Sequence, residues 1–93
     1  LSDMPKIICV LIYLIFSISF ADNFSEAIDA YDRQEYEEAL RLFSELEKLG
    51  HIAAANNLAT MYQTGTGTFK NYAKAAELYL KAAKAGHIDA AFN

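Results

Sequence analysis

The sequence predicts an all-α protein built as a solenoid of stacked helix pairs, and three observations support this prediction. First, residues 35–57 align without a gap with residues 71–93, and ten of the twenty-three aligned positions are identical. Second, apolar residues recur at helical spacing after residue 22, and no segment alternates as a strand does. Third, glycines separate the helical segments. A repeat of thirty-six residues is typical of αα-hairpin solenoids, whose helix pairs bury their apolar faces against each other.

The N-terminal segment predicts export. Residues 7–21 carry no charge, Lys6 precedes them, and the small residues Ser19 and Ala21 stand just before Asp22. A basic start, a short apolar core and a small-x-small exit form a secretory signal peptide. The apolar run is shorter than the roughly 20 residues of a bilayer span, although a membrane anchor is the alternative. We therefore expect a signal peptide within residues 1–21 and a secreted or periplasmic protein.

Composition excludes several classes of function. Cys9, the only cysteine, lies inside the predicted signal, so we expect no disulfide in the exported chain. The net charge is −4, with nine acids against two arginines over residues 22–47 and a mildly basic remainder. No dense basic stripe is present, so we expect no nucleic-acid partner.

Residues 22–50 are predicted to form a first, degenerate helix pair. Asn23 is placed to cap the first helix, with Glu26 at capping-box spacing. Residues 32–35 interrupt the pattern, and a second helix runs from Tyr36 to about Leu49. Its outer face carries three charges of alternating sign at helical spacing: Glu37, Arg41 and Glu45. Its apolar face comprises Tyr36, Ala39, Leu40, Phe43 and Leu46.

Residues 51–86 are predicted to form the second pair. A third helix spans Ile52 to Thr64, and Asn71 caps a fourth helix that ends at Gly86. Residues 87–93 would start a further repeat. Glycines that close helices take positive φ, which we expect at Gly50, Gly65 and Gly86. The apolar face of the third helix comprises Ala54, Ala55, Leu58, Ala59 and Tyr62.

The stretch from Asn57 to Asn93 resembles the Sel1-like repeat, a relative of the tetratricopeptide repeat. It contains leucine-alanine-x-x-tyrosine (residues 58–62), a glycine-x-glycine loop (65–67) and tyrosine-x-lysine-alanine (72–75), in that order. The resemblance implies a right-handed superhelix of helix pairs that acts as an adaptor or scaffold. Residues 27–49 fit the pattern less closely and resemble a tetratricopeptide junction.

The residues that could suggest chemistry are better explained by structure. His51 and His87 follow glycines at equivalent points of successive repeats, without a recurring acid or cysteine beside them. Metal sites need clustered ligands, so we expect both histidines to serve the turns. The Gly65–Gly67 loop lacks the lysine and the preceding strand of a phosphate loop. We therefore expect no enzyme activity, no cofactor and no metal.

The first helix of each pair in such solenoids lines the concave surface. Aligning Tyr31 with Tyr62 brings six polar positions together on that surface. They form the predicted partner-binding groove: Ser25, Asp29, Asp32, Asn56, Thr60 and Gln63.

The sequence thus predicts an exported protein-protein interaction module that binds a protein or peptide. The alternatives are a cell-envelope enzyme of the repeat family and a truncated product without independent function. We also expect self-association through an apolar surface near the C-terminal end. Its predicted residues are Leu78, Ala82, Ile88, Ala91 and Phe92.

Overall fold

The structure is a computed structural model that describes residues 8, 10–11 and 23–92, with residues 87–92 described by their backbone alone. Helix 23–32, α2 (Tyr36–Lys48), α3 (Ile52–Thr64) and α4 (Tyr72–Phe92) follow one another along the chain. The described residues include no strand, which confirms the all-helical prediction. The predicted signal lies outside the described residues, except for Ile8, Val10 and Leu11.

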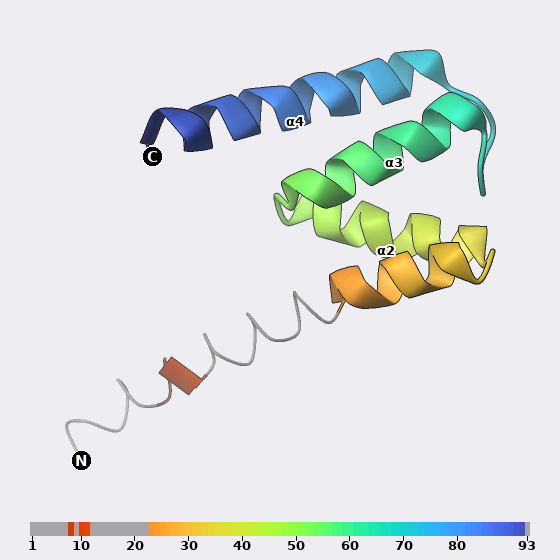
Figure 1. Cartoon of the computed structure of the whole chain (residues 1–93), viewed down its shortest axis with the longest axis horizontal. Coiled ribbons are helices and arrows are strands. Elements are labelled where there is room, and N and C mark those ends of the chain that lie inside the picture. The colour runs from red at the N-terminus through yellow and green to blue at the C-terminus, as the bar shows by residue number, and fades with distance from the viewer. Residues whose placement is uncertain (1–7, 9, 12–22, 93) are drawn as a thin grey trace.

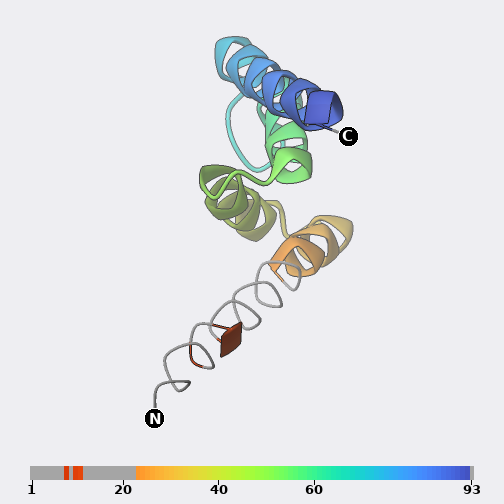
Figure 2. The ribbon, with the colours of Figure 1, turned by 90° about the vertical axis from the view of Figure 1, so that its left-hand side faces the viewer.

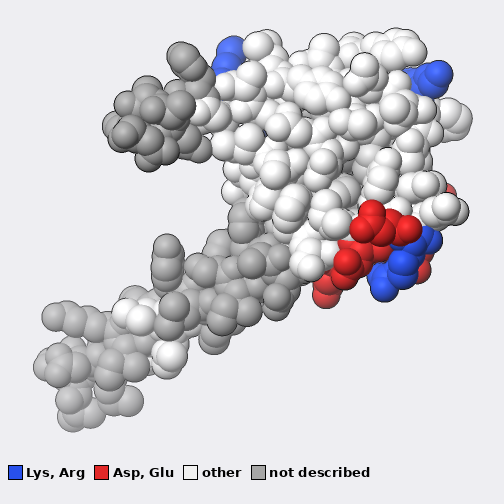
Figure 3. All heavy atoms as spheres, in the orientation of Figure 1, with Lys and Arg blue, Asp and Glu red and all other residues white. Residues whose placement is uncertain are grey.

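The helices stack in chain order, and neighbours pack together. α3 packs against both α2 and α4. Figure 2 shows helix 23–32 and α3 on one side of the stack and α2 on the other. Helix 23–32 and α3 therefore share the face that is turned toward the viewer in Figures 1 and 3. This is the arrangement that the predicted groove requires.

Helix 23–32, α2 and α3 end with the same backbone device, a residue in the left-handed conformation. Gly50 (φ 89°) follows α2, where the Gly50 N–H donates to Glu47 O and the His51 N–H donates to Leu46 O. This pair of hydrogen bonds is the Schellman motif, which satisfies the last carbonyls of a helix. Gly65 (φ 70°) ends α3.

Helix 23–32 closes in the same way, although no glycine is present. Gln34 takes φ 64°, its N–H donates to Tyr31 O, and the Glu35 N–H donates to Ala30 O. An L-residue adopts this conformation at a cost that glycine avoids. Asn23, the first described residue of this segment, is already helical, so the prediction that Asn23 caps the helix is wrong.

The loop between α3 and α4 reaches back to the start of α2, as Figure 1 shows. Gly67 has φ 73°, and a Cβ atom there would lie 2.7 Å from the carbonyl oxygen of Tyr36. Only glycine permits this approach. Asn71 then caps α4 as predicted, because its Oδ1 accepts from the Lys74 N–H at 3.0 Å.

The predicted end of the fourth helix at Gly86 is wrong. α4 runs without a break through Gly86, which does not have positive φ. Alanine-rich sequence around Gly86 favours the helix, and an interior glycine costs only about 1 kcal/mol relative to alanine. After Gly50, by contrast, α3 folds back onto α2 and secures the turn.

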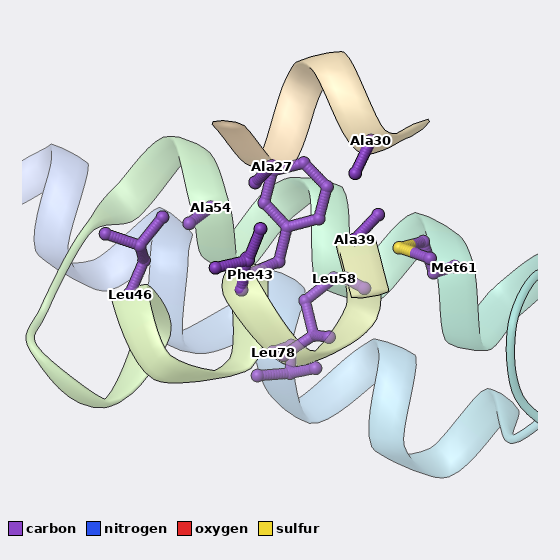
Figure 4. Packing of buried hydrophobic residues seen from close by; sticks show 11 residues of the cluster. Ala27, Ala30, Ala39, Phe43, Leu46, Ala54, Leu58, Met61 and Leu78 are labelled. Atoms are coloured by element: carbon purple, nitrogen blue, oxygen red, sulfur yellow. The ribbon is translucent and has the colours of Figure 1, made fainter. Parts of the chain in front are cut away.

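The core is a single cluster of small and aliphatic side chains between the helices (Figure 4). Phe43 and Leu46 from α2 and Met61 from α3 are its largest fully buried members. Of the predicted apolar faces of α2 and α3, Tyr36, Leu40 and Tyr62 are only partly buried, and the other residues are buried. Leu42 and Met61 are buried in addition. Leu78 and Ala82 are only 3% and 4% exposed, so the prediction that they form an open apolar surface is wrong. Self-association stays a prediction, because the other three residues named for it lie outside the described side chains.

Candidate functional site

The six residues of the predicted groove lie on helix 23–32 and α3. Each of the six is exposed. Ser25, Asp29 and Asp32 lie on helix 23–32, and Asn56, Thr60 and Gln63 lie on α3. The pairing of Tyr31 with Tyr62 thus selected solvent-facing positions correctly on both helices.

Two of these side chains are engaged by α4. The hydroxyl oxygens of Thr60 and Tyr79 lie 2.7 Å apart, and the Tyr79 hydroxyl donates to Gln63 Oε1 at 3.1 Å. Thr60 Oγ1 also donates to the carbonyl oxygen of Asn56. Thr60 and Gln63 therefore join α3 to α4, and their free hydrogen-bonding capacity is smaller than the sequence indicated.

Between helix 23–32 and α3 lies a pocket of about 180 Å³ that the sequence analysis did not identify. We call it the Phe43 pocket, after the α2 residue in its lining. Its lining comprises Ile28, Tyr31, Phe43, Asn57 and Thr60. Figure 4 shows the Phe43 ring reaching from α2 toward helix 23–32 at Ala27.

Asn57 is the polar residue that sequence reasoning missed. It follows Asn56 directly, but it is half-buried and lines the Phe43 pocket. Neither its side chain nor that of any other described residue is buried with an unsatisfied polar atom. One feature of the sequence could have identified Asn57: an asparagine, Asn93, stands at the equivalent position of the following repeat.

Acidic side chains gather on one part of this face, whereas basic side chains also appear at its upper edges in Figure 3. Figure 3 shows acidic and basic side chains gathered where helix 23–32 leads into α2, with an uncharged surface above them. Arg33 lies 3.5 Å from Glu35 in an exposed ion pair. Asp29 and Asp32 form no ion pair with the described residues.

Arg41 joins two carboxylates on the outer side of α2. It contacts Glu45 at 2.8 Å, as the alternating charges predicted, but its second partner is Glu38 where Glu37 was expected. A hydrogen bond from Arg41 lowers the pKa of Glu38. This exposed cluster supports the helix, and Glu38 and Arg41 also line a wide, open hollow of about 800 Å³ that extends to Gly67.

His51 serves the turn, which is the structural role expected for it. Its Nδ1 accepts from the Ala54 N–H at 3.1 Å and so caps α3. The imidazole also stacks on Phe24, with ring centroids 4.4 Å apart. Burial lowers the pKa of His51, and its use of Nδ1 as an acceptor also requires the neutral ring. The side chain of His87 lies outside the described part of the chain.

The described residues also bear on metal binding and on membrane-spanning helices. They contain no group of three or more histidine, cysteine, aspartate or glutamate side chains arranged to hold a metal ion. Of the helices described, none is long and apolar enough to cross a membrane.

Comparison with known proteins identifies the repeat. The family model described as Sel1 repeat matches residues 52–87, which include all of α3 and most of α4. No curated protein and no solved structure matches the chain. Sel1 repeats are generally protein-interaction modules and are typically non-catalytic. The all-helical fold agrees with this match, which supports the assignment of residues 52–87 to a Sel1-like repeat.

Proposed function

We propose that this chain is an exported adaptor or scaffold that binds a segment of another protein on the face formed by helix 23–32 and α3. One observation carries the proposal: both helices flank a pocket and present exposed polar side chains beside it. A small pocket with a few polar groups at its edge is suited to positioning a ligand. We further infer from the family resemblance that this face is the concave side of a right-handed superhelix.

Selection from a random peptide library would test the proposed face. The chain recovered from an export-competent host is the target, and the dissociation constants of the enriched peptides are measured. Asn56→Arg places a long charged side chain on the proposed face, whereas Ala73→Arg places the same side chain at an exposed position of α4. We expect Asn56→Arg to abolish binding and Ala73→Arg to leave it unchanged. Equal effects, or no enriched peptide, would contradict the proposal.

Export is the second part of the proposed function, and it is supported by the sequence alone. The small residues Ser19 and Ala21 before Asp22 favour cleavage at that point. In a host with an active export system, mass analysis of the protein should give a mature chain that begins at Asp22. A membrane-bound product that retains residues 7–16 would favour the anchor instead.

A further inference from the structure

We propose that the Phe43 pocket receives one aliphatic side chain of an extended peptide, and that this peptide carries a basic residue next to the aliphatic one. The inference rests on the proposed function, since it specifies the ligand of the same face. Three observations carry it: the size and lining of the pocket, the amide of Asn57, and the acidic residues that directly follow two lining residues in sequence.

The size of the pocket suits a side chain better than a small molecule. Its volume of about 180 Å³ is below the roughly 300–1,000 Å³ of typical small-molecule sites. Ile28 and Phe43 supply apolar walls from two helices. Tyr31 is 37% exposed, so its ring stands at the rim where a ligand would cover it. Burial of an aliphatic side chain here would remove apolar surface of both partners from water.

Asn57 supplies the polar contact that an extended backbone needs. Its side chain makes no hydrogen bond with any described residue, whereas Thr60 in the same lining is already engaged by Tyr79. A carboxamide has one acceptor oxygen and a donor NH₂ group, which match the N–H and C=O of a peptide unit. A peptide whose side chain enters the pocket would place its backbone at the pocket edge, beside this amide.

Two acidic residues that directly follow lining residues of the pocket in sequence specify the neighbouring residue of the peptide. Asp29 and Asp32 flank Tyr31 in sequence, are exposed, and have no ion-pair partner among the described residues. The nearby Arg33 is paired with Glu35. A lysine or arginine of the ligand would complement the two free carboxylates, and such contacts contribute specificity and association rate.

The test uses the enriched peptides from the library selection, with binding measured by fluorescence polarisation. We expect these peptides to contain an aliphatic residue beside a lysine or arginine. Replacing the aliphatic residue by alanine should weaken binding about tenfold or more. Replacing the basic residue by glutamine should weaken it several-fold at low salt and change little at high salt.

Two neighbouring residues of α3 provide a matched pair of protein variants. Asn57→Ala removes the pocket amide and should weaken binding about fivefold or more. Asn56→Ala makes the same change on the adjacent exposed position, outside the pocket lining, and should have a clearly smaller effect. Circular dichroism shows whether both variants fold. If Asn57→Ala does not fold, the peptide substitutions still test whether an aliphatic and a basic residue of the ligand are required.

The outcomes separate the inference from the proposed function. Enriched peptides that bind the face, but are indifferent to the aliphatic residue and to Asn57→Ala, would overturn the inference and leave the proposed function standing. Peptides enriched in acidic residues would also overturn the inference. A chain that binds no peptide would overturn both.

Discussion

The α-carbon of Gly67 lies so close to Tyr36 that an added Cβ atom would be 2.7 Å from the carbonyl oxygen and 2.9 Å from the carbonyl carbon of Tyr36. These two residues belong to successive helix pairs. The loop that leads into α4 is therefore fitted against the backbone at the start of α2. The rigid carbonyl group cannot move aside as a flexible side chain would.

Replacement of glycines by alanine should therefore have opposite effects at different positions. Gly67→Ala combines positive φ with a backbone clash and should lower the free energy of unfolding by about 1–3 kcal/mol. Gly86→Ala is the matched control, because Gly86 is helical and a Cβ there meets nothing within 4 Å. It should raise stability by about 0.5–1 kcal/mol. Denaturant unfolding measures both, and a destabilising Gly86→Ala would restore the predicted helix end at that residue.

Gln34 offers a second test of the left-handed helix endings. Gln34→Gly should raise the free energy of unfolding by up to about 1 kcal/mol, because glycine adopts the observed φ of 64° without strain. Gln34→Ala keeps the Cβ atom and should change stability little. Similar unfolding midpoints for the two variants would show that the positive φ of Gln34 carries no strain.

Tyr79 should matter through its hydroxyl group. Tyr79→Phe removes the contacts to Thr60 and Gln63 and should lower the free energy of unfolding by about 0.5–1 kcal/mol. Tyr72→Phe is the control, since Tyr72 is 66% exposed and has no hydroxyl hydrogen bond to the described residues. A double-mutant cycle with Gln63→Ala should show coupling to Tyr79 and none to Tyr72. The absence of coupling would mean that these hydroxyl contacts do not hold α4.

The cap at His51 predicts a pH dependence of stability. Because the folded-state pKa of His51 is lowered by burial, the unfolded chain takes up the proton first as pH falls. The contribution of His51 is thus full above the ordinary histidine pKa of about 6.5 and is lost as pH falls toward the folded-state pKa. His51→Asn keeps a capping side chain that does not titrate, so it should reduce the loss of stability as pH falls below the ordinary histidine pKa of about 6.5. An unchanged pH dependence in His51→Asn would assign the effect to another group.

The fold was largely predictable because it is encoded in local periodicity. The bounds of α3 and the capping of α4 by Asn71 follow from the pattern of apolar residues and caps. Leu42 and Met61 were missed because an interior helix of a stack contacts neighbours on two sides, which widens its buried face. The predicted helix end at Gly86 was wrong because a glycine alone does not end these helices, and packing of the neighbouring helix is also required.

The site was predictable only in part. Helical phase predicted that Ser25 and Asn56 point to solvent, and both are exposed. The Phe43 pocket was not predictable, because Ile28, Phe43 and Asn57 come from three different helices and their common cavity depends on how those helices pack. The engagement of Thr60 by Tyr79 depends likewise on the position of α4.

The tripeptide Gly-His-Ile occurs twice in this chain, with opposite outcomes. At residues 50–52 the backbone reverses and His51 opens a new helix, whereas at residues 86–88 the helix continues. The tripeptide alone therefore does not determine whether the chain turns, and at residues 50–52 the turn is accompanied by the packing of α3 against α2. Grafting these three residues into an isolated helix would therefore not create a hairpin, and construction of longer arrays from this sequence would have to transfer α2 and α3 together with the turn.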